Sequence, residues 1–463
     1  MSEIKKVIDN DYCIGCGACA ITNHTISIKR NQYGLKTARY DDSTKFSSKD
    51  NSVCPFSTSI DENVLGKQFF SQISKIQYDR KIGYYLSLYA GNITNNQMRM
   101  NTSSGGILSW LASYLLENNL VDGIIHVKST DSSPDLFKYT LSTSSQEILN
   151  RGKSRYYHVS FEDIKDLLND PKLVGRYVFV GVPCYIKAMR LLSEEIPQLK
   201  SQIIYYFALF CGHMKTSAFA ELLSWQQGIH PNDLKSIDFR VKNLTGLSSR
   251  YSVSAESKTG KKVKDKSYRL YGSDWGLGFF KPKACDWCDD VSGELADITF
   301  GDAWLPEYTD DSLGTNILIV RNTLLDTILR EQSCLNLLNV TEISKEKVIA
   351  SQAGNYRHRH EGLSIRTEKA DVQEVWHPKK RIRKTDYEVS TSRKGLYLVR
   401  EEISLKSHKY FLKAKEKSNL MIFVIKMLPL ELKYHYYNKR LIKGTVKTFL
   451  NILTLNFKKE KQQ

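Results

Sequence analysis

Apolar residues in the middle of the chain follow helical and strand periods in turn. In "SSGGILSWLASYLLENNLVDGIIHV" they recur every three or four positions from Ile107 to Asn118 and then form a short run from Ile124 to Val127. This pattern predicts an amphipathic helix that begins after a glycine turn, followed by a buried strand. The segments "YVFVGVPCYIKAMRLL" and "IIYYFALFCGHMKTSAFAELLSWQQG" each predict a buried strand, a Gly-containing turn and a helix. This order is that of α/β units.

Strands without intervening helices are expected farther along the chain. Alternating positions from about Ser236 to Tyr271 predict a β-rich stretch with "TGKK" as a hairpin turn. Two more strands are predicted, one from Ala296 to Phe300 and one in "TNILIVRN", before a further helix. The predicted fold class is therefore mixed α/β (α+β).

Length and composition indicate folded domains. The chain has 463 residues, of which 41% are hydrophobic, enough for two or three domains with their own cores. It does not open on a charged segment followed by an apolar run, and no apolar run reaches the roughly 18–20 residues of a membrane span. We therefore expect a cytoplasmic protein, in which the nine cysteines are ligands or catalytic groups rather than disulfides.

The N-terminal cysteines have the spacing of an iron–sulfur run. Cys13, Cys16 and Cys19 form C-x2-C-x2-C, but positions 23 and 24, where a ferredoxin-type run would end in Cys-Pro, hold Asn and His. Cys54 is followed by Pro55 and supplies the missing dipeptide from a distance. The four cysteines are predicted to bind a [4Fe–4S] cluster. A zinc site is the alternative, although zinc ligands more often come as two separated C-x2-C pairs.

A second set of cysteines lies in the α/β region. Cys184 and Cys211 each follow a predicted buried strand at a Gly-containing turn, where α/β folds place functional groups. Cys285 and Cys288 form a C-x2-C pair that two further thiolates would complete. The spacing leaves two interpretations open, a second metal cluster and buried cysteines that act as small apolar side chains. Cys334 has no partner in either set.

The segment "RMNTSSGGIL" places hydroxyls and two glycines at a predicted helix N-terminus. Free N–H groups and the helix dipole at such a position favour a phosphate. The segment has neither the Walker nor the G-x-G-x-x-G pattern, so a simple capping turn is the alternative.

Four motifs in this order resemble the coenzyme F420 hydrogenase/dehydrogenase beta-subunit family of flavin and iron–sulfur oxidoreductases. They are "CIGCGAC", "RMNTSSGGILSWLASYLLENNLVDGII", "VFVGVPCYIKAMR" and "CDWCDDVSGELADITFGDAW", and they span about residues 10 to 330. The resemblance implies FAD bound near a [4Fe–4S] cluster, with electrons exchanged between a donor such as ferredoxin and a substrate at the flavin. It also favours the second cluster. The residues that it implies for flavin contact are Ser103, Ser104, Gly105 and Gly106.

The chain departs from the family pattern at three places. The compact N-terminal run lacks its fourth cysteine, which Cys54 is expected to replace. Where the family often has Gly-Thr-Pro-Cys-Gln, this chain ends the motif in Cys184 and Tyr185, so that a polar contact beside the cofactor is expected to be missing. "FCGH" also orders Gly212 and His213 unlike the family. The motif sequences resemble those of bacterial relatives associated with exopolysaccharide or capsule assembly more than those of the archaeal hydrogenase subunits. Use of the deazaflavin coenzyme is therefore not expected.

Three other polar features are candidates for chemistry. Asp302 in "FGDAW" is a candidate general acid, with a structural turn as the alternative. His213 is a candidate proton shuttle, with a hydrogen-bonded structural histidine as the alternative. The run from Arg357 to His360 in "NYRHRHEGLSIR" is a candidate clamp for an anionic sugar phosphate, with a solvated basic loop as the alternative.

The net charge of +17 is concentrated in the tail. Residues 376–463 contain 22 Lys and Arg against 7 Asp and Glu, and no nucleic-acid-binding motif accompanies them, so no nucleic-acid partner is expected. The runs Leu420 to Ile425 and Phe449 to Leu455 are too short to span a bilayer and are bordered by lysines. They predict helices lying on an anionic membrane surface at its inner face. A helical hairpin packed on the body is the alternative.

Together these features predict three segments: a ferredoxin-like iron–sulfur segment (1–75), a flavin-binding oxidoreductase domain (76–365) and a basic helical extension (366–463). The leading functional hypothesis is an FAD- and iron–sulfur-dependent oxidoreductase that acts on a glycan precursor. The alternatives are an electron-relay subunit of a larger oxidoreductase and a zinc-stabilised scaffold without catalysis.

Overall fold

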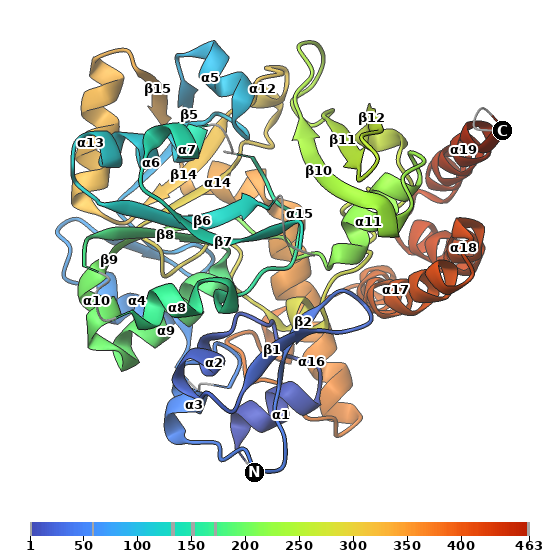
Figure 1. Cartoon of the computed structure of the whole chain (residues 1–463), viewed down its shortest axis with the longest axis horizontal. Helices are drawn as coiled ribbons and strands as arrows, with labels where there is room; N and C mark the ends of the chain where they lie inside the picture. Colours follow the sequence, from blue (N-terminus) through green and yellow to red (C-terminus); the bar gives the residue numbers. More distant parts are fainter. Residues whose placement is uncertain (1, 58–59, 131–134, 150–152, 171–173, 461–463) are drawn as a thin grey trace.

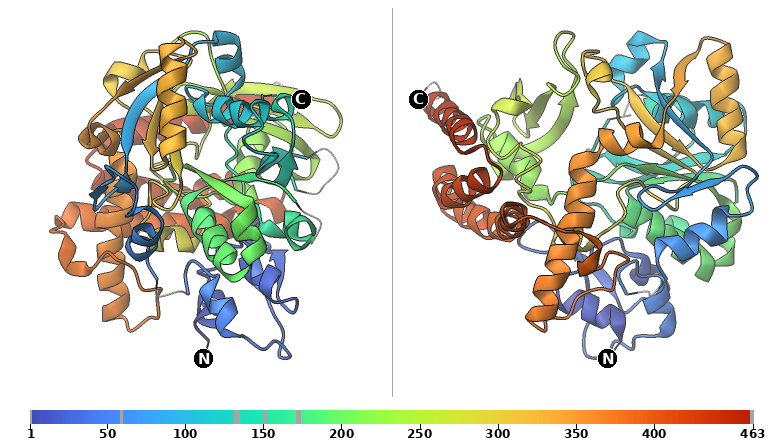
Figure 2. Two further views of the ribbon diagram at one scale, coloured as in Figure 1. Left: turned by 90° about the vertical axis from the view of Figure 1, so that its left-hand side faces the viewer. Right: turned by 180° about the vertical axis from the view of Figure 1, so that it is seen from behind.

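The computed structural model describes residues 2–57, 60–130, 135–149, 153–170 and 174–460. Its fold is mixed α/β, as predicted, and is organised around one large sheet (Figure 1). The N-terminal segment lies at the bottom of Figure 1, below the sheet. A small three-stranded sheet and the C-terminal helices lie together at one side, which the two further views of Figure 2 also show.

The large sheet has eight strands in the order β15-β5-β14-β13-β9-β8-β6-β7. Its four inner strands β13, β9, β8 and β6 are mutually parallel, and antiparallel strands complete both edges. The strands are β5 (Ser87–Ile93), β6 (Gly123–Ser129), β7 (Phe137–Ser142), β8 (Tyr177–Gly181), β9 (Ile203–Leu209), β13 (Ile298–Asp302), β14 (Asn316–Val320) and β15 (Leu338–Glu342). The carboxyl ends of β8, β9 and β13 meet at one edge, which is where α/β sheets carry their functional groups.

The predicted helices and strands of this region are confirmed. The helix expected from Ile107 to Asn118 is α6 (Ile107–Glu117), and the two strand-turn-helix segments are β8 with α9 (Pro183–Glu195) and β9 with α11 (Ser217–Trp225). The helix expected after β14 is α13 (Thr323–Cys334). The alternation of side chains along β8 explains the apolar run, because Val178 and Val180 face one core while Phe179 faces another.

The β-rich stretch forms the separate three-stranded sheet. Its strands are β10 (Leu234–Val241), β11 (Ser252–Ser257) and β12 (Lys262–Lys266), and "TGKK" lies at the turn between β11 and β12, as predicted. Helix α11 packs against β10 and β11 and connects this sheet to the body.

The N-terminal segment consists of short elements around the first cysteine set. It contains α1 (Glu3–Asp9), α2 (Ala18–Thr22), β1 (Ser27–Arg30), β2 (Lys36–Arg39), α3 (Ser48–Ser52) and α4 (Glu62–Phe70). Its apolar side chains belong to the same core as residues of β8, α9 and the C-terminal helices. A β-hairpin of β3 (Gln77–Asp79) and β4 (Gly83–Tyr85) leads into the large sheet.

Residues 345–372 form a helical column beside the sheet. It contains α14 (Lys345–Ser351), α15 (Ala353–Tyr356), the π-helical turn η5 (Arg357–Glu361) and α16 (Gly362–Val372). The boundary expected at 365/366 falls inside α16. The backbone continues as one helix across it.

The basic extension is a set of three helices, α17 (Thr391–Glu416), α18 (Leu420–Tyr437) and α19 (Leu441–Glu460). The first of its two apolar runs does not lie on a surface, because Phe423 and Val424 are fully buried against the body. For this run the hairpin alternative holds. The second run belongs to α19, where Phe449, Leu450 and Leu453 are exposed. Among the described residues, no helix combines the length and the apolar character that crossing a membrane requires.

Candidate functional site

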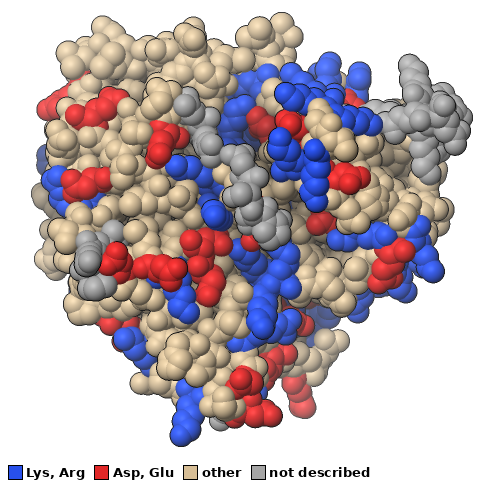
Figure 3. All heavy atoms as spheres, in the orientation of Figure 1, with Lys and Arg blue, Asp and Glu red and all other residues tan. Residues whose placement is uncertain are grey.

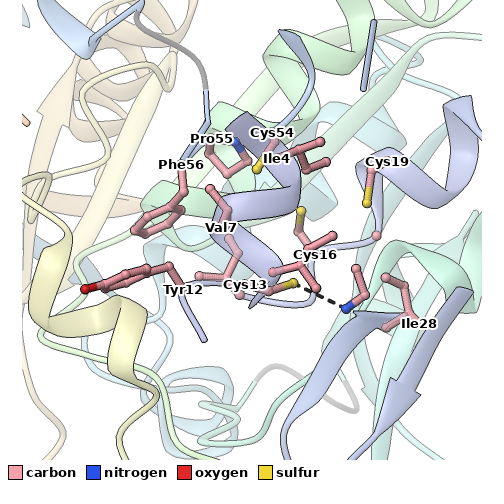
Figure 4. A pocket seen from close by; sticks show the side chains of 14 residues that line it. Ile4, Val7, Tyr12, Cys13, Cys16, Cys19, Ile28, Cys54, Pro55 and Phe56 are labelled. Carbon is pink, nitrogen blue, oxygen red and sulfur yellow. Dashed lines mark hydrogen bonds between the residues drawn. The ribbon is translucent and has the colours of Figure 1, made fainter. Parts of the chain in front are cut away.

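The first cysteine set lines a single pocket in the N-terminal segment. Cys13 and Cys16 lie in the loop between α1 and α2, Cys19 lies in α2, and Cys54 follows α3. Their sulfurs face the same space, and Ile4, Val7 and Phe56 complete an apolar wall around it (Figure 4). The distant Cys54 is therefore brought to the place where the compact run lacks its fourth cysteine.

Backbone geometry allows the loop to wrap closely around the sulfurs. The N–H groups of Gly15 and Ala38 each donate a hydrogen bond to Cys13 Sγ, at 3.3 Å in both cases. Gly15 has φ +60°, and a Cβ atom there would lie 2.1 Å from the carbonyl oxygen of Lys36, so only glycine fits. Backbone N–H groups aimed at sulfur stabilise the thiolate form and tune the potential of an iron–sulfur cluster.

A buried histidine that the sequence analysis missed holds this loop. His158 Nε2 lies 2.7 Å from the carbonyl oxygen of Ile14, and His158 Nδ1 accepts from the N–H of Lys36 at 3.0 Å. These partners assign the proton to Nε2. Burial lowers the pKa of His158 to about 3, so the ring stays neutral. A lone histidine more than a hundred residues from the cysteines carries no local sequence signal for this role.

The second cysteine set is also brought together. Cys184 is the second residue of α9, at the carboxyl end of β8, and Cys211 follows the neighbouring parallel strand β9. Cys285 lies in the 3-10 turn η4 (Lys283–Trp287), and Cys288 follows it. Burial raises the pKa of the Cys184 thiol, and the charges of the other three cysteines raise it further. The four thiols are therefore close enough to interact electrostatically across a hundred residues of sequence.

Burial shapes the chemistry of both sets. It raises the pKa of Cys13 and Cys285 to about 11 and that of Cys211 to about 12. Within the first set, the charge of Cys54 contributes to the raised pKa of both Cys16 and Cys13. Four buried thiolates repel one another, so a cation or metal cluster is needed to hold them ionised together.

Within the described part of the chain, no three His, Cys, Asp or Glu side chains are close enough to hold a single metal ion. Four thiolates on one zinc ion would lie within about 4 Å of one another, because each Zn–S bond is about 2.3 Å long. A cube of four iron atoms takes its four thiolates at separate corners, which lie farther apart. The donor sets fit such a cube: the first is four cysteine sulfurs that line an apolar pocket, and the second is four cysteines of which three are buried.

Aromatic rings connect the two sets. Tyr12 precedes Cys13, Trp287 precedes Cys288, and the two rings meet edge to face with centroids 5.6 Å apart. Tyr185, next to Cys184, donates from its hydroxyl to the carbonyl of Val159 at 2.6 Å. Burial raises the pKa of Tyr185, and the charges of Cys16 and Cys184 raise it further. The phenol at position 185 thus bonds to backbone carbonyls, and the loss of a polar contact to the cofactor there stays a prediction.

The residues implied for flavin contact separate into two pairs. Ser103 and Ser104 line a small polar pocket, but Gly105 and Gly106 are packed behind it. A Cβ at Gly105 would lie 2.5 Å from the carbonyl oxygen of Gly91. The first N–H of α6 is also occupied, because Ile107 donates to Asn316 Oδ1 at 3.1 Å. The two glycines therefore shape the turn and face away from the pocket.

Two cations that the sequence analysis missed line the same pocket. Arg240 at the end of β10 forms a two-pronged ion pair with Asp302, at 2.8 Å to each oxygen. Lys242 donates to the carbonyl of Ser104 at 2.7 Å and to that of Arg99. Burial and the charges of Arg99 and Arg240 lower the pKa of Lys242 to about 7. Arg240 and Lys242 come from another sheet and lie about 140 positions after Ser103 in the sequence. No local sequence motif therefore predicts their place in the pocket.

The two weak catalytic candidates occupy structural positions. Both carboxylate oxygens of Asp302 accept from Arg240, which favours the structural interpretation over a general acid. The ring of His213 stacks on Trp275 with centroids 4.4 Å apart, and burial together with the charge of Lys215 lowers its pKa well below the usual value. Its Nε2 has no hydrogen-bond partner within the described residues, and its role stays a prediction.

The run of basic residues at 357–360 lies in a helical turn and is buried except for Arg357, so it is not a solvated loop. His358, Arg359 and His360 are fully buried in the π-helical turn η5. The sequence pattern of charged residues predicts exposure, whereas these three side chains are buried. Arg359 faces the second cysteine set, and His358 lies against Lys281 and Asp286. Arg359 donates toward Cys211 Sγ at 3.7 Å, which places a guanidinium directly beside the thiols.

Comparison with known proteins matches this arrangement to one family. Residues 88–164 match the family model described as "Coenzyme F420 hydrogenase/dehydrogenase, beta subunit N-term", and residues 174–346 match the companion model for the C-terminal part of the same beta subunit. Similar curated proteins include the coenzyme F420 hydrogenase subunit beta of Methanococcus voltae, 24% identical over 230 residues (49% of this chain and 75% of that protein). An uncharacterized protein of Methanocaldococcus jannaschii is 22% identical over 276 residues (58% and 92%).

Among solved structures, the chain is similar to one in the F420-reducing [NiFe] hydrogenase complex from Methanosarcina barkeri. The TM-score is 0.49 at 15% sequence identity, over 66% of this chain and 98% of the other. The two family matches together span more than half of the 463 residues and include Ser103, Cys184, Cys211, Cys285 and Cys288. The chain therefore belongs to the coenzyme F420 hydrogenase/dehydrogenase beta-subunit family.

Proposed function

We propose that the protein is an iron–sulfur electron-transfer component of an oxidoreductase, with one [4Fe–4S] cluster at each cysteine set. The observation that carries the proposal is the pairing of two four-cysteine sets through Tyr12 and Trp287. When bound, such clusters accept and release single electrons. The residues of the chain hold the ligands in place, exclude water and keep the two sites close.

The first cluster would be held by Cys13, Cys16, Cys19 and Cys54, and the second cluster by Cys184, Cys211, Cys285 and Cys288. Anaerobic purification followed by iron, sulfide, zinc and flavin assays tests the proposal. We expect about eight iron atoms per chain, four for each cube. Zinc without iron would instead favour the scaffold alternative.

The polar pocket at Ser103 and Ser104 is the proposed flavin site. FAD carries a pyrophosphate, and the pocket combines hydroxyls with the ammonium group of Lys242. Lys242 forms no ion pair with a carboxylate among the residues that the structure describes, so an anionic ligand would be its counter-charge.

Replacing Lys242 by Ala is expected to weaken FAD binding at least tenfold, because a partly buried charge-assisted contact is lost. Binding to the unchanged protein should weaken as the pH rises from 6 to 8.5, since Lys242, with a pKa of about 7, loses its charge in that window. Isothermal titration or flavin fluorescence measures both effects. Lys258→Ala, at an exposed lysine of the small sheet, is the matched control. Equal affinities of the two variants for FAD would contradict the placement of the flavin in this pocket.

The proposed partner is an acidic electron-transfer protein such as a ferredoxin. Figure 3 shows Lys and Arg side chains gathered over the small sheet of β10–β12, although the body of the protein is nearly neutral in total. The exposed lysines of this face are Lys258, Lys261, Lys262, Lys264 and Lys266. Such a patch steers an acidic partner in a way that weakens with salt.

The substrate remains a separate proposal. A glycan precursor would require chemistry at the flavin, whereas a relay subunit needs only the clusters and a partner. The buried aromatic link between the cysteine sets supports the relay, and we propose it as the primary function. Turnover of a glycan precursor by the isolated protein, supplied with reduced ferredoxin alone, would favour the glycan reductase instead.

Helix α19 is the proposed contact with an anionic membrane surface. Ile442, Val446, Phe449, Leu450 and Leu453 lie exposed along one side of it, at the spacing of a helical stripe. Gly444 and Thr448 form the opposite side, which packs on α18. Lysines border the apolar stripe, and this combination fits an anionic lipid interface.

Full-length protein is expected to co-sediment with anionic vesicles and not with neutral ones. The double substitution Phe449→Asp and Leu450→Asp should lower the bound fraction at least fivefold, because it places two charges in the apolar stripe. The same substitutions leave the face toward α18 intact, so the fold is retained. Leu335→Asp, at a side chain 65% exposed on the body, is the control. Unchanged sedimentation of the double variant would exclude α19 as the contact.

A further inference from the structure

Arg359 is a buried cation whose surroundings contain sulfur in place of carboxylates. Its side chain is 1% exposed and lies in the π-helical turn η5, between α15 and α16. A π turn adds a residue to a helix and redirects the side chains around it, and such turns often occur at functional sites. Arg357, two positions earlier on the same turn, points to solvent.

The hydrogen bonds of the guanidinium go to two cysteines of the second set and to Gly212, which follows one of them. Nε donates to the carbonyl of Gly212 at 2.8 Å, and Nη1 donates to the carbonyl of Cys288 at 3.2 Å. Nη2 reaches the carbonyl of Cys211 at 3.3 Å and Cys211 Sγ at 3.7 Å. The carbonyl contacts fix the plane of the guanidinium, so that its charge stays beside the sulfurs.

No carboxylate within the described residues forms an ion pair with Arg359. The charges that act on it most strongly are those of Cys288, Cys211, Cys285 and Cys184. An arginine keeps its charge even when buried, and a buried charge needs a counter-charge. Neutral thiols would not provide one, whereas thiolates bound to an anionic cluster would.

The first cysteine set has a different environment. The sulfur of Cys13 accepts from two neutral backbone N–H groups. Among the described residues, no Lys or Arg side chain donates to a sulfur of this set. The nearest charges act from a distance and have mixed signs, with Arg39 near Cys13, Lys380 near Cys54 and Asp50 near Cys19. Lys380, Asp289 and Asp290 also act on Cys288 of the second set, so what distinguishes the two sets is the positive charge that Arg359 holds by a hydrogen bond to a sulfur.

We propose that Arg359 is a positioning residue that makes the second cysteine set the more easily reduced of the two. The inference rests on the proposed function, since it requires a cluster at each set. Reduction by one electron adds one negative charge to a site and breaks no bond, and a fixed cation at that site stabilises the reduced form. An electron supplied by an external one-electron iron–sulfur donor then moves from the N-terminal set toward the second set.

Potentiometric titration followed by electron paramagnetic resonance tests this assignment on the full-length, iron-loaded protein. Two one-electron transitions are expected. Arg359→Gln should lower the midpoint potential of the higher transition by at least about 59 mV, which corresponds to a tenfold change in the reduction equilibrium of a one-electron couple. The midpoint potential of the lower transition should not change. Arg359→Lys keeps the charge and should shift the midpoint potential of the higher transition less. Arg357→Gln, the matched loss of charge on the same turn, should shift neither.

A second measurement does not depend on the folding of the Arg359 variants. Cys54→Ala removes a ligand of the first set, so the protein should retain only the higher transition. Retention of the lower transition alone would overturn the inference, as would an unshifted higher transition in iron-loaded Arg359→Gln. Wild-type protein with about four iron atoms would instead overturn the proposed second cluster, so the two failures are distinguishable.

Discussion

Replacing Cys54 by Ala is expected to lower the iron content from about eight to about four atoms per chain. Cys54 supplies the fourth sulfur to the pocket of Cys13, Cys16 and Cys19, and it comes from a separate turn after α3. With three sulfurs and an apolar wall, the pocket offers no other ligand of comparable strength at that corner. Anaerobic iron and acid-labile sulfide assays on the purified variant measure the loss.

Two further variants make this result specific. Cys288→Ala should lose the other half of the iron, since it removes a buried thiol that is a ligand in the proposed second cluster. Cys334→Ala is the matched control, because Cys334 is exposed on α13 and belongs to neither set. Full iron content in Cys54→Ala would show that the fourth ligand of the first cluster is another group, and the Cys54–Pro55 dipeptide would then be structural.

The cysteine sets illustrate what spacing and periodicity can predict. Cys184 and Cys211 follow continuous apolar runs, which predict buried strands, and the carboxyl ends of neighbouring parallel strands meet at one edge of a sheet. The proposed second cluster adds the sulfurs of this edge to those of Cys285 and Cys288. The prediction required no knowledge of strand order beyond the tendency of successive α/β units to lie side by side.

The cations of the site could not be predicted in the same way. Arg359 lies in a run of charged and histidine residues, and such a run is typical of an exposed loop. Its buried position lies beside Cys211, which is far away in sequence. Lys242 and Arg240 reach the pocket at Ser103 from a different sheet, so their role depends on tertiary packing alone. Local pattern contains no information about either arrangement.

The C-terminal helices show the same limit. Both apolar runs, Leu420 to Ile425 and Phe449 to Leu455, are short and bordered by lysines, so they predict the same behaviour from sequence. Phe423 enters an aromatic cluster of the body, whereas Phe449 remains exposed. What distinguishes the runs is the presence of a complementary apolar surface opposite the first one.

Phe423→Ala is accordingly expected to destabilise the protein by about 3–5 kcal/mol, the cost of emptying a well-packed aromatic site. Its ring is fully buried and lies 5.4 Å to 5.6 Å, between centroids, from the rings of Phe411, Phe279 and Phe280. Ile425→Ala, at a side chain 64% exposed on the same helix, should change the stability by less than about 0.5 kcal/mol. Urea denaturation under anaerobic conditions, followed by tryptophan fluorescence, compares the two variants.

The same substitution should also affect the second cysteine set, because α17 and α18 support the chain that leads to it. The backbone N–H of Phe280 donates to Ser407 Oγ at 2.9 Å, and Ser404 Oγ donates to the carbonyl of Lys281 at 2.8 Å. Cys285 follows four residues later, in η4. Iron loss from Phe423→Ala should therefore begin at a lower urea concentration for the second cluster than for the first. Simultaneous loss of both clusters, at the midpoint of global unfolding, would show that the C-terminal helices stabilise the whole body equally and give the second site no separate support.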